Sequence, residues 1–356
     1  MKGGGVGVTD DIGVVGEGDD CRYKAFGEGQ FLGTTEEEES VKHGIGCSSD
    51  GLVWHDGQTL TFPDPQRYDT HNNVQFHEGS KDYLYTTRAG FSDSPGRCAG
   101  AAMGKNGAFS KYDVDFDSFE TTEKGSSDAQ IYAQLPFAVN DIYLAHSMVF
   151  DAEDSENGRV RCFLSWSPDG LNDWEFVEGD EHGPRDFIPL GDVGDFDSNV
   201  CFASTQPFVD NITGLTSVYY MGGNGPHNGD RNSSLGLATL ETFDRFAGIG
   251  GSGGNGTVAV SDGLFEVDGE LLVVTADSLV YGGDDSDSYV RVGVECDDGC
   301  DGLGAKDATK IMLGEGNATD TVVEWASGKT IEDLKGKKVK IQVDVGDAIL
   351  YSIGFQ

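Results

Sequence analysis

The first 254 residues contain four segments of similar design, and this internal repeat constrains the fold more than any other feature of the sequence. Each segment opens with an Asp and an apolar run, and the opening residues are Asp11, Asp69, Asp128 and Asp197. They are spaced by 58, 59 and 69 residues. Three further apolar or aromatic runs follow in each segment, which gives four candidate strands per repeat. Such repeats are typical of β-propeller blades.

The runs themselves favour strands over helices. The opening runs read DDIGVV, DTHNNVQF, DAQIYAQLPF and DSNVCFAS, and the second runs read RYKAFGEG, DYLYTTR, DIYLAHSMVF and SVYYMGG. Paired outer strands are expected over HGIGCSSDGLVWH, CAGAAMGKNGAFSKY, VRCFLSWSPDGLNDWEF and SSLGLATLETFDRFAGI. The 53 Gly residues suit short strands joined by turns. We therefore predict an all-β fold with a β-propeller over residues 1–254, of which four blades are visible. A β-sandwich with evenly spaced strands is the alternative.

Two of the segments share the sequence Ser-x-Asp-Gly-Leu followed by a Trp, at residues 48–54 and 167–174. In the predicted blades this sequence joins the third and fourth strands. Asp50 and Asp169 can accept backbone N–H bonds within the turn, the Gly allows a positive φ, and the Trp can pack between neighbouring blades. We predict that both Asp residues are structural and that both Trp residues are buried.

The repeat ends at a Gly-rich linker, IGGSGGNG, at residues 249–256. Beyond it, the runs TVAVSDGLFEVDGELLVVTADS, SYVRVGVE and KKVKIQVDVGDAILYSIGF alternate without the blade period. Alternation of this kind is typical of a β-sandwich. We predict a second domain over residues 255–356, with an accessory, stabilising or glycan-binding role.

The chain is strongly acidic, with 62 Asp and Glu, 24 Lys and Arg, and a net charge of −38. This charge repels phosphates and anionic lipids, so we expect neither a nucleic acid nor a membrane as partner. A salt-adapted extracellular surface explains the charge, and structural calcium bound by some carboxylates is the alternative. No other cofactor or metal is indicated, and we expect a monomer.

The seven cysteines show no zinc pattern. Only Cys296 and Cys300 are close in sequence, and without His partners they indicate a small disulfide loop. Four Asn-x-Ser/Thr acceptor sequences are compatible with secretion, so an extracellular location is favoured.

Together these features resemble the glycoside hydrolase family 32/43-type superfamily, which combines a five-bladed propeller with a β-sandwich. Elements such as RYKAFGEG, SPDGL…W and VRVGVE are similar to family 32-like relatives, and the turn resembles the Asp-box turn of sialidases. The resemblance implies hydrolysis of a fructan or a plant- or algal-type glycan. In that family the first blade supplies a catalytic carboxylate. Here a fifth blade would precede Asp11, so either the N-terminus is truncated or the protein lacks that group.

Three of the opening Asp residues are candidate catalytic groups. Asp69, Asp128 and Asp197 hold corresponding positions on strands that would converge on one channel. Glycoside hydrolysis needs two carboxyl groups flanking the scissile bond. The alternative is that each Asp binds local backbone N–H groups at the start of its strand.

Polar side chains beside the same strands are candidate substrate-binding groups. Amides donate and accept hydrogen bonds to sugar hydroxyls, and an Arg can bind a carboxylate or a sulfate. The alternative for the Arg residues is a salt bridge between blades. His146 could face the channel or be packed in the core. The candidates are His71, Arg88, Gln130, Asn199 and Arg231.

The sequence therefore predicts a carbohydrate-active protein, a glycoside hydrolase that uses paired carboxylates in a propeller channel. The alternative is a non-catalytic glycan-binding or structural propeller.

Overall fold

The computed structural model describes most of the chain with several gaps. The described residues are 6–10, 22–28, 43–59, 71–77, 82–89, 97–104, 116–123, 129–139, 142–151, 158–177, 186–204, 206–251, 257–280, 288–314 and 316–356. Within these ranges the regular elements are β-strands and two short 3₁₀ helices, so the all-β prediction is confirmed. The predicted residues Asp11, Asp69 and Asp128 lie outside the described ranges. No helix among the described residues is long and apolar enough to cross a bilayer.

The chain divides into two compact units. The first comprises Met1–Phe208 with Ser217–Thr239, and the second comprises Val209–Thr216 with Leu240–Gln356. Each unit is built from sheets of mainly antiparallel strands and has its own hydrophobic cluster.

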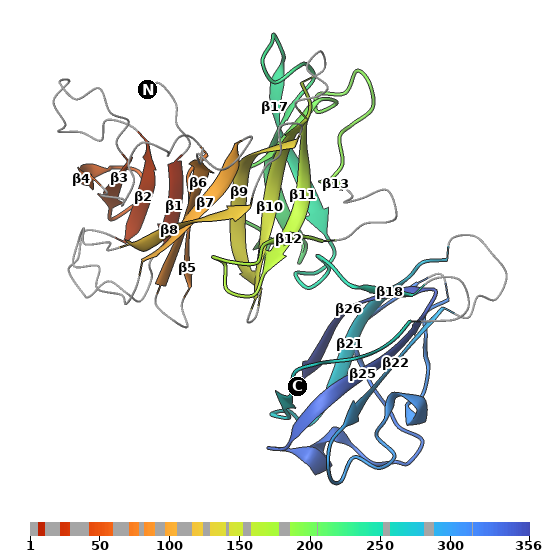
Figure 1. Cartoon of the computed structure of the whole chain (residues 1–356). Helices are drawn as coiled ribbons and strands as arrows, with labels where there is room; N and C mark the ends of the chain where they lie inside the picture. The colour runs from red at the N-terminus through yellow and green to blue at the C-terminus, as the bar shows by residue number, and fades with distance from the viewer. Residues whose placement is uncertain are drawn as a thin grey trace. The chain divides into compact units, whose positions relative to one another are not determined.

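The first eight strands of the first unit form two four-stranded antiparallel sheets (Figure 1). Their bounds are β1 Val6–Asp10, β2 Tyr23–Glu28, β3 His43–Ser48, β4 His55–Thr59, β5 Asn73–His77, β6 Asp82–Ala89, β7 Cys98–Gly104 and β8 Phe116–Glu123. In each sheet, strands that follow one another in sequence also lie beside one another. Strand β1 contacts β5, so the two sheets meet through their first strands.

A larger sheet follows. Its strands are β9 Ala129–Val139, β10 Ile142–Asp151, β11 Val160–Ser167, β12 Glu175–Phe176, β13 Asp186–Ile188, β14 Val200–Ala203, β16 Thr216–Gly223 and β17 Ser233–Leu240, and the short β15, Phe208–Val209, lies at the boundary of the units. The order β9-β10-β11-β14-β16 is extended by β12 and β13, which pair with β11, and by β17, which pairs with β16. Strands β11 and β14 are parallel and joined only through Val160 and Val200. The sheet therefore consists of two antiparallel sets, and β5, β6 and β7 contact the first of them at β9.

Most of the predicted strands are present, with three corrections. The second outer strand of the second segment, β8, lies at Phe116–Glu123, beyond the run at residues 98–112 where it was expected. Strand β1 ends at Asp10, whereas the first strand was expected to open at this point. The run at residues 233–249 was expected to form two outer strands, but only one of them, β17, is present. The next strand, β18 (Ile249–Gly251), pairs instead with β26 (Ala348–Phe355) in the second unit. The main chain packs closely here, because a Cβ on Gly248 would lie 2.5 Å from the Leu350 carbonyl oxygen.

The two Ser-x-Asp-Gly-Leu turns have the predicted hydrogen bonds. Asp169 Oδ1 accepts from the backbone N–H groups of Leu171 and Asn172 at 2.8 and 2.7 Å. Asp50 Oδ1 accepts two equivalent bonds in its own turn, at 2.8 Å each. The Gly in each turn has a φ of +75° or +79°. The structural assignment of both Asp residues is therefore confirmed.

The two turn Trp residues differ in their burial. Trp174 is 9% exposed and packs in one cluster with Leu84, Ala101 and Tyr143, which come from two neighbouring sheets. Its Nε1 donates to the Gly170 carbonyl at 3.1 Å. Trp54 is only half-buried, so the predicted burial is confirmed for Trp174 and wrong for Trp54. Trp54 follows two exposed residues, Leu52 and Val53, at the edge of its sheet.

The second unit contains two antiparallel sheets around one core. The sheets have the orders β18-β26-β21-β24 and β19-β25-β22-β23, and β20 pairs with β25. The remaining bounds are β19 Thr257–Val260, β20 Phe265–Glu266, β21 Leu272–Ser278, β22 Tyr289–Glu295, β23 Ile311–Met312, β24 Asn317–Val322 and β25 Lys338–Gly346, with 3₁₀ helices η1 Ala305–Asp307 and η2 Ile331–Leu334. Side chains from both sheets, including Val274, Val292 and Val343, form a single hydrophobic cluster.

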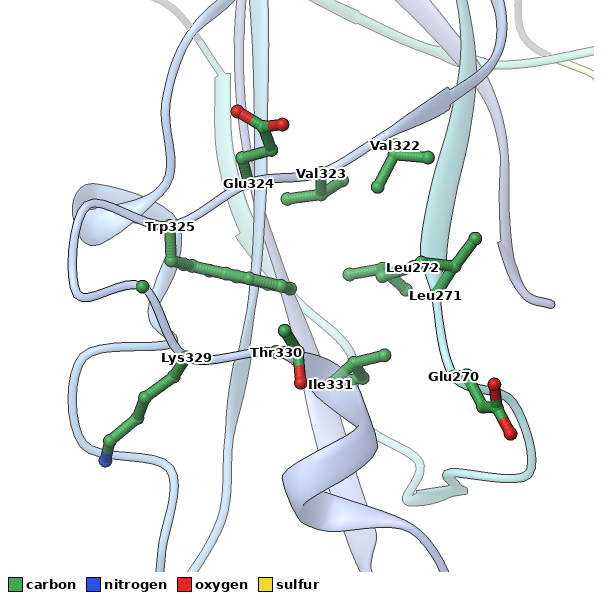
Figure 2. Close-up of a pocket in the computed structure, with 11 residues that line it drawn as sticks. Glu270, Leu271, Leu272, Val322, Val323, Glu324, Trp325, Lys329, Thr330 and Ile331 are labelled. Carbon is green, nitrogen blue, oxygen red and sulfur yellow. The ribbon is translucent and has the colours of Figure 1, made fainter.

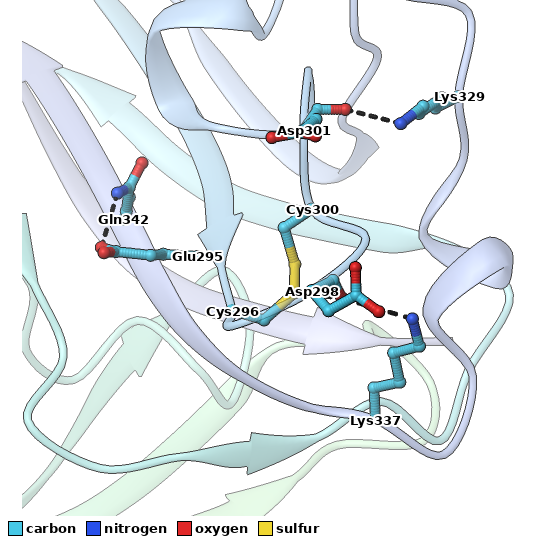
Figure 3. Close-up of a disulfide and its surroundings, with 8 residues drawn as sticks. All are labelled: Glu295, Cys296, Asp298, Cys300, Asp301, Lys329, Lys337 and Gln342. Carbon is cyan, nitrogen blue, oxygen red and sulfur yellow. Dashed lines mark hydrogen bonds between the residues drawn. A yellow bond between two sulfur atoms is a disulfide. The ribbon is translucent and has the colours of Figure 1, made fainter.

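The predicted disulfide between Cys296 and Cys300 is present and closes a tight loop after β22 (Figure 3). Two lysines tie this loop to the neighbouring chain: Lys337 Nζ donates to the Asp298 carbonyl at 3.3 Å, and Lys329 Nζ donates to the Asp301 carbonyl at 2.7 Å. Gln342 holds the end of β22 through a 3.0 Å bond to Glu295. The disulfide therefore belongs to a locally bonded surface loop.

Candidate functional site

Tyr132 lies at the centre of the candidate site in the first unit. Its ring is on β9 and is only 4% exposed. The guanidinium carbons of Arg88, near the end of β6, and Arg97, just before β7, lie 4.9 and 5.1 Å from the ring centroid. His227, in the loop between β16 and β17, meets the same ring edge-on at 4.7 Å. Four segments of the chain thus converge on one aromatic ring.

A second aromatic layer extends this group. The imidazole of His71 lies parallel to the Phe202 ring, with centroids 5.1 Å apart and an interplanar angle of 2°. Phe202, on β14, lies 5.7 Å from His227, and Phe150, on β10, lies 5.5 Å from it. His71 has a φ of +61°, a backbone conformation that few residues other than Gly adopt. His71 thus combines this uncommon backbone conformation with a parallel contact to the Phe202 ring.

Hydrogen bonds fix the positions of two arginines. Arg97 Nη1 donates to Gln130 Oε1 at 2.7 Å, and the Arg97 carbonyl accepts from the Ile131 N–H at 3.0 Å. Arg231 Nη1 donates to the carbonyl of His227, which closes the loop on itself. The same loop is anchored to Gly158, whose carbonyl accepts from the His227 N–H at 2.9 Å.

The charges around His227 change its titration. Burial lowers the pKa of its imidazole, and the positive charges of Arg231, Arg88 and Arg97 lower it further. The ring is therefore neutral at pH 7. Its Nδ1 atom is buried and finds no hydrogen-bond partner among the residues that the structure describes. We call this group the basic-aromatic cluster, and its members are His71, Arg88, Arg97, Tyr132, Phe202, His227 and Arg231.

Three of the five predicted substrate-binding residues belong to this cluster, and a fourth contacts it. His71, Arg88 and Arg231 are members, and Gln130 is bonded to Arg97. The fifth residue, Asn199, lies next to the cluster through its main chain, because its backbone N–H donates to the Gly223 carbonyl at 3.0 Å. A Cβ on Gly223 would lie 2.9 Å from Cδ of Arg231.

The structure separates Asp197 from the cluster. Its carboxylate is buried and accepts a 2.6 Å hydrogen bond from Tyr220 Oη. The neighbours of two successive glycines of β16 show which face each side chain lies on. A Cβ atom added to Gly222 would meet Asp197, and one added to Gly223 would meet Arg231. Successive residues of a strand face opposite sides, so Asp197 and Arg231 lie on opposite faces of β16. The other candidate carboxylates, Asp69 and Asp128, lie outside the described residues and precede His71 and Gln130 by two positions.

Sequence reasoning did not single out Arg97 or Tyr132. Their side chains meet only because Arg97 is bonded through its main chain to β9, across a gap of more than thirty residues. Basic residues are scarce in this sequence, and that scarcity was the one signal that could have marked Arg97 as a candidate site residue. His146, left open between channel and core, is fully buried between Phe137 and Phe187, and burial lowers its pKa to about 3. It is therefore a neutral core residue.

The second unit contains a separate pocket of about 350 Å³ (Figure 2). Leu272, Val323, Trp325 and Ile331 form its apolar part, and Figure 2 shows the Trp325 ring lying between Val323 and Thr330. Lys329, Glu270 and Glu324 also line the pocket. The indole Nε1 of Trp325 is buried and has no hydrogen-bond partner in the described part of the chain. The pocket therefore offers an apolar surface with charged side chains in its lining.

Among the described residues, no group of three or more His, Cys, Asp or Glu side chains is arranged to hold a metal ion. An acidic surface pocket of about 370 Å³ does lie beside the disulfide loop, and its lining includes Asp297, Asp301 and Asp307.

No protein-family profile and no curated protein matches this sequence. Among solved structures, a putative glycoside hydrolase from Parabacteroides distasonis is 12% identical over 67% of this chain and 69% of its own, with a TM-score of 0.43. An endo-1,5-α-L-arabinanase from Thermotoga petrophila is 9% identical over 92% of this chain and 80% of its own, with a TM-score of 0.43. A family 32 β-fructofuranosidase from Bombyx mori is 10% identical over 94% and 89%, with a TM-score of 0.31. At these TM-scores the similarity assigns the chain to no family.

Proposed function

We propose that this chain is a carbohydrate-active protein, a glycoside hydrolase that binds its glycan at the basic-aromatic cluster. The observation that carries the proposal is the convergence of His71, Arg88 and His227 around Tyr132. Arg231 is bonded to the His227 carbonyl, and Gln130 is bonded to Arg97, which also lies over the Tyr132 ring. Aromatic rings next to amide and guanidinium donors match the two faces of a sugar, one apolar and one lined by hydroxyl groups. The substrate that the sequence resemblance suggests is a fructan or a plant- or algal-type glycan.

In this proposal Asp69 and Asp128 are the paired carboxylates. One would protonate the leaving oxygen while the other acts as nucleophile or activates water. Their places in the sequence, two residues before His71 and Gln130, support the assignment. Asp197 is the weaker candidate, because its carboxylate is bonded to Tyr220 on the other face of β16.

We propose in addition that the first unit is a β-propeller and the second a β-sandwich. The sets β1–β4, β5–β8, β9–β12 and β14 to β17 would be propeller blades, and the two sheets of the second unit would form a β-sandwich. Support comes from the contacts of β1 with β5 and of β5 with β9, since the first strands of adjacent blades are neighbours in a propeller.

The test is hydrolysis of a panel of fructans, arabinans, xylans, galactans and algal polysaccharides, followed by reducing-sugar release. The wild-type protein should cleave at least one of them, and Asp128→Asn and Asp69→Asn should each lower kcat by about a hundredfold or more, since general acid–base catalysis typically contributes 10²–10⁴-fold. Asp197→Asn is the comparison variant. Full activity in both the Asp69 and Asp128 variants would contradict the proposal.

A non-catalytic glycan-binding protein is the second candidate. It is favoured by Asp197, the only predicted catalytic carboxylate among the described residues, because that group does not face the cluster. Saturable binding to a glycan of the panel without any release of sugar would identify this function.

A further inference from the structure

The basic-aromatic cluster brings together positively charged side chains, which are scarce in this chain. The chain has 24 basic residues against 62 acidic ones. Three arginines nevertheless come together at one site, with Arg88 and Arg97 at the ring of Tyr132 and Arg231 bonded to the main chain of His227. Like charges repel each other, so an anion bound among these arginines would be stabilised by their positive charges.

The lowered pKa of His227 is consistent with the three arginines lying close to its imidazole. Its imidazole responds to the charges of Arg231, Arg88 and Arg97, each of which comes from a different loop or strand end. The three positive charges therefore act on one small region of the surface.

Arginines elsewhere in the described chain are arranged differently. Four of them also lie over an aromatic ring, and three of these four pair with a carboxylate: Arg161 with Asp186, Arg245 with Asp277, and Arg291 with Asp344. By contrast, no carboxylate within the described ranges pairs with the guanidinium group of Arg97 or Arg231. Arg97 bonds to the neutral amide of Gln130, and Arg231 bonds to main-chain carbonyls.

Two buried polar atoms point to the same conclusion. Nε of Arg231 and Nδ1 of His227 are buried, and within the described ranges neither has a hydrogen-bond partner. Arg97 itself is exposed, so its remaining N–H groups can reach a bound molecule. A guanidinium group binds a planar oxyanion through two parallel hydrogen bonds.

We propose that the basic-aromatic cluster selects a sugar that carries an oxyanion, either the carboxylate of a uronic acid or a sulfate ester. Arg97 and Arg231 hold the anion, and the partly exposed imidazoles of His71 and His227 contact the sugar ring. This inference rests on the proposed glycan site and adds to it the substrate class, an acidic polysaccharide.

The test compares probes that differ only in the anion. Tetragalacturonate is compared with its carboxyl-reduced neutral form, and a carrageenan tetrasaccharide is compared with its desulfated form. Affinity is measured by titration calorimetry at physiological ionic strength, where charges on the rest of the surface are screened beyond about 8 Å. The variants are Arg97→Met, which removes the charge, and Arg97→Lys, which keeps it. Arg161→Met is the matched control, because Arg161 also lies over a ring but is outside the cluster.

At least one anionic probe should bind about tenfold or more tighter than its neutral partner, which corresponds to about 1.4 kcal/mol. Arg97→Met should abolish that preference, Arg97→Lys should keep part of it, and Arg161→Met should leave it unchanged. Which probe is preferred distinguishes a carboxylate from a sulfate.

Equal binding of charged and neutral probes, or an equal preference in Arg97→Met, would overturn the inference and leave the proposed function standing. Failure to bind any of the four probes in a protein that cleaves another glycan would have the same meaning. A protein that neither binds nor cleaves any glycan tested would overturn both.

Discussion

Tyr220 donates a 2.6 Å hydrogen bond to the carboxylate of Asp197, and both side chains are buried. Three glycines make room for the pair: a Cβ on Gly191 or Gly222 would collide with Asp197, and one on Gly236 would collide with the Tyr220 ring. Burial raises the pKa of Tyr220, and the bond to Asp197 raises it further, so the phenol remains a donor far above neutral pH. The hydrogen bond from Tyr220 and the space left by these glycines thus give Asp197 a structural role.

Tyr220→Phe keeps the ring and removes the only hydrogen-bond donor that the described chain gives to the Asp197 side chain. Leaving a buried acceptor without its partner costs about 1–3 kcal/mol, and we expect a loss of that size in the free energy of unfolding measured in urea. Hydrolysis of a cleaved glycan should be unchanged in the folded variant. A stable variant that had lost activity would instead give Asp197 and Tyr220 a direct role in the site.

The two turn Trp residues should differ in their effect on stability. Trp174→Ala removes a buried ring that packs against two sheets, and we expect a loss of roughly 3–5 kcal/mol. Trp54→Ala, in the equivalent turn, is the matched control and should cost clearly less because Trp54 is more exposed than Trp174. Urea denaturation of both variants measures the difference, and equal losses would contradict this account of the packing.

Asp169 should contribute a stability that depends on pH. Partial burial raises its pKa, but hydrogen bonds from Asn172 and Leu171 outweigh this effect, so the pKa lies below the usual 3.8. A lowered native pKa means that the unfolded chain binds more protons in this range. The contribution is therefore complete above pH 3.8 and is lost as the pH falls through the native pKa.

The comparison variant is Asp169→Asn, which keeps an acceptor oxygen and removes the titration. Because the side chain is exposed, we expect the wild type to be more stable by only roughly 0.2–1 kcal/mol at pH 7. This difference should shrink as the pH falls below 4 in thermal unfolding at a series of pH values. A difference that stayed constant or grew in acid would be contrary to the hydrogen-bond pattern of the turn.

Cys98, Cys162 and Cys201 should be unreactive in the folded protein. All three thiols are buried, and the hydrogen bond with Cys162 together with burial raises the pKa of Cys201. Only the thiolate reacts with alkylating reagents, so iodoacetamide at pH 8 should label these positions after denaturation and not before. Peptide mapping by mass spectrometry measures the labelling at each position. Rapid labelling of Cys162 or Cys201 in the native state would show that this core opens.

The features that the sequence predicted well are local ones. Both Ser-x-Asp-Gly-Leu turns and the Cys296–Cys300 loop depend on residues within a few positions of one another. Alternating apolar runs likewise located β5, β9, β14 and most strands of the second unit, because the two-residue period of a strand is visible in any short window.

Long-range geometry decided what the sequence could not predict. Whether Asp197 and Arg231 share a face depends on the register of β14 against β16, which pairs Val200 with Gly223. The meeting of Arg97 with Tyr132 depends on how successive sheets pack, and no local pattern encodes that distance. Similarly, β18 pairs with β26, almost one hundred residues away, which removed one of the expected outer strands.

The central claim is that the basic-aromatic cluster binds the glycan. Hydrogen–deuterium exchange, with and without the best-bound of the four oligosaccharide probes, tests it most directly. Amide exchange should slow in residues 97–104, 129–139 and 224–232, which carry Arg97, Tyr132 and His227, and should be unchanged in residues 316–334 around Trp325. Protection confined to the Trp325 pocket, with no change in the cluster, would contradict the claim.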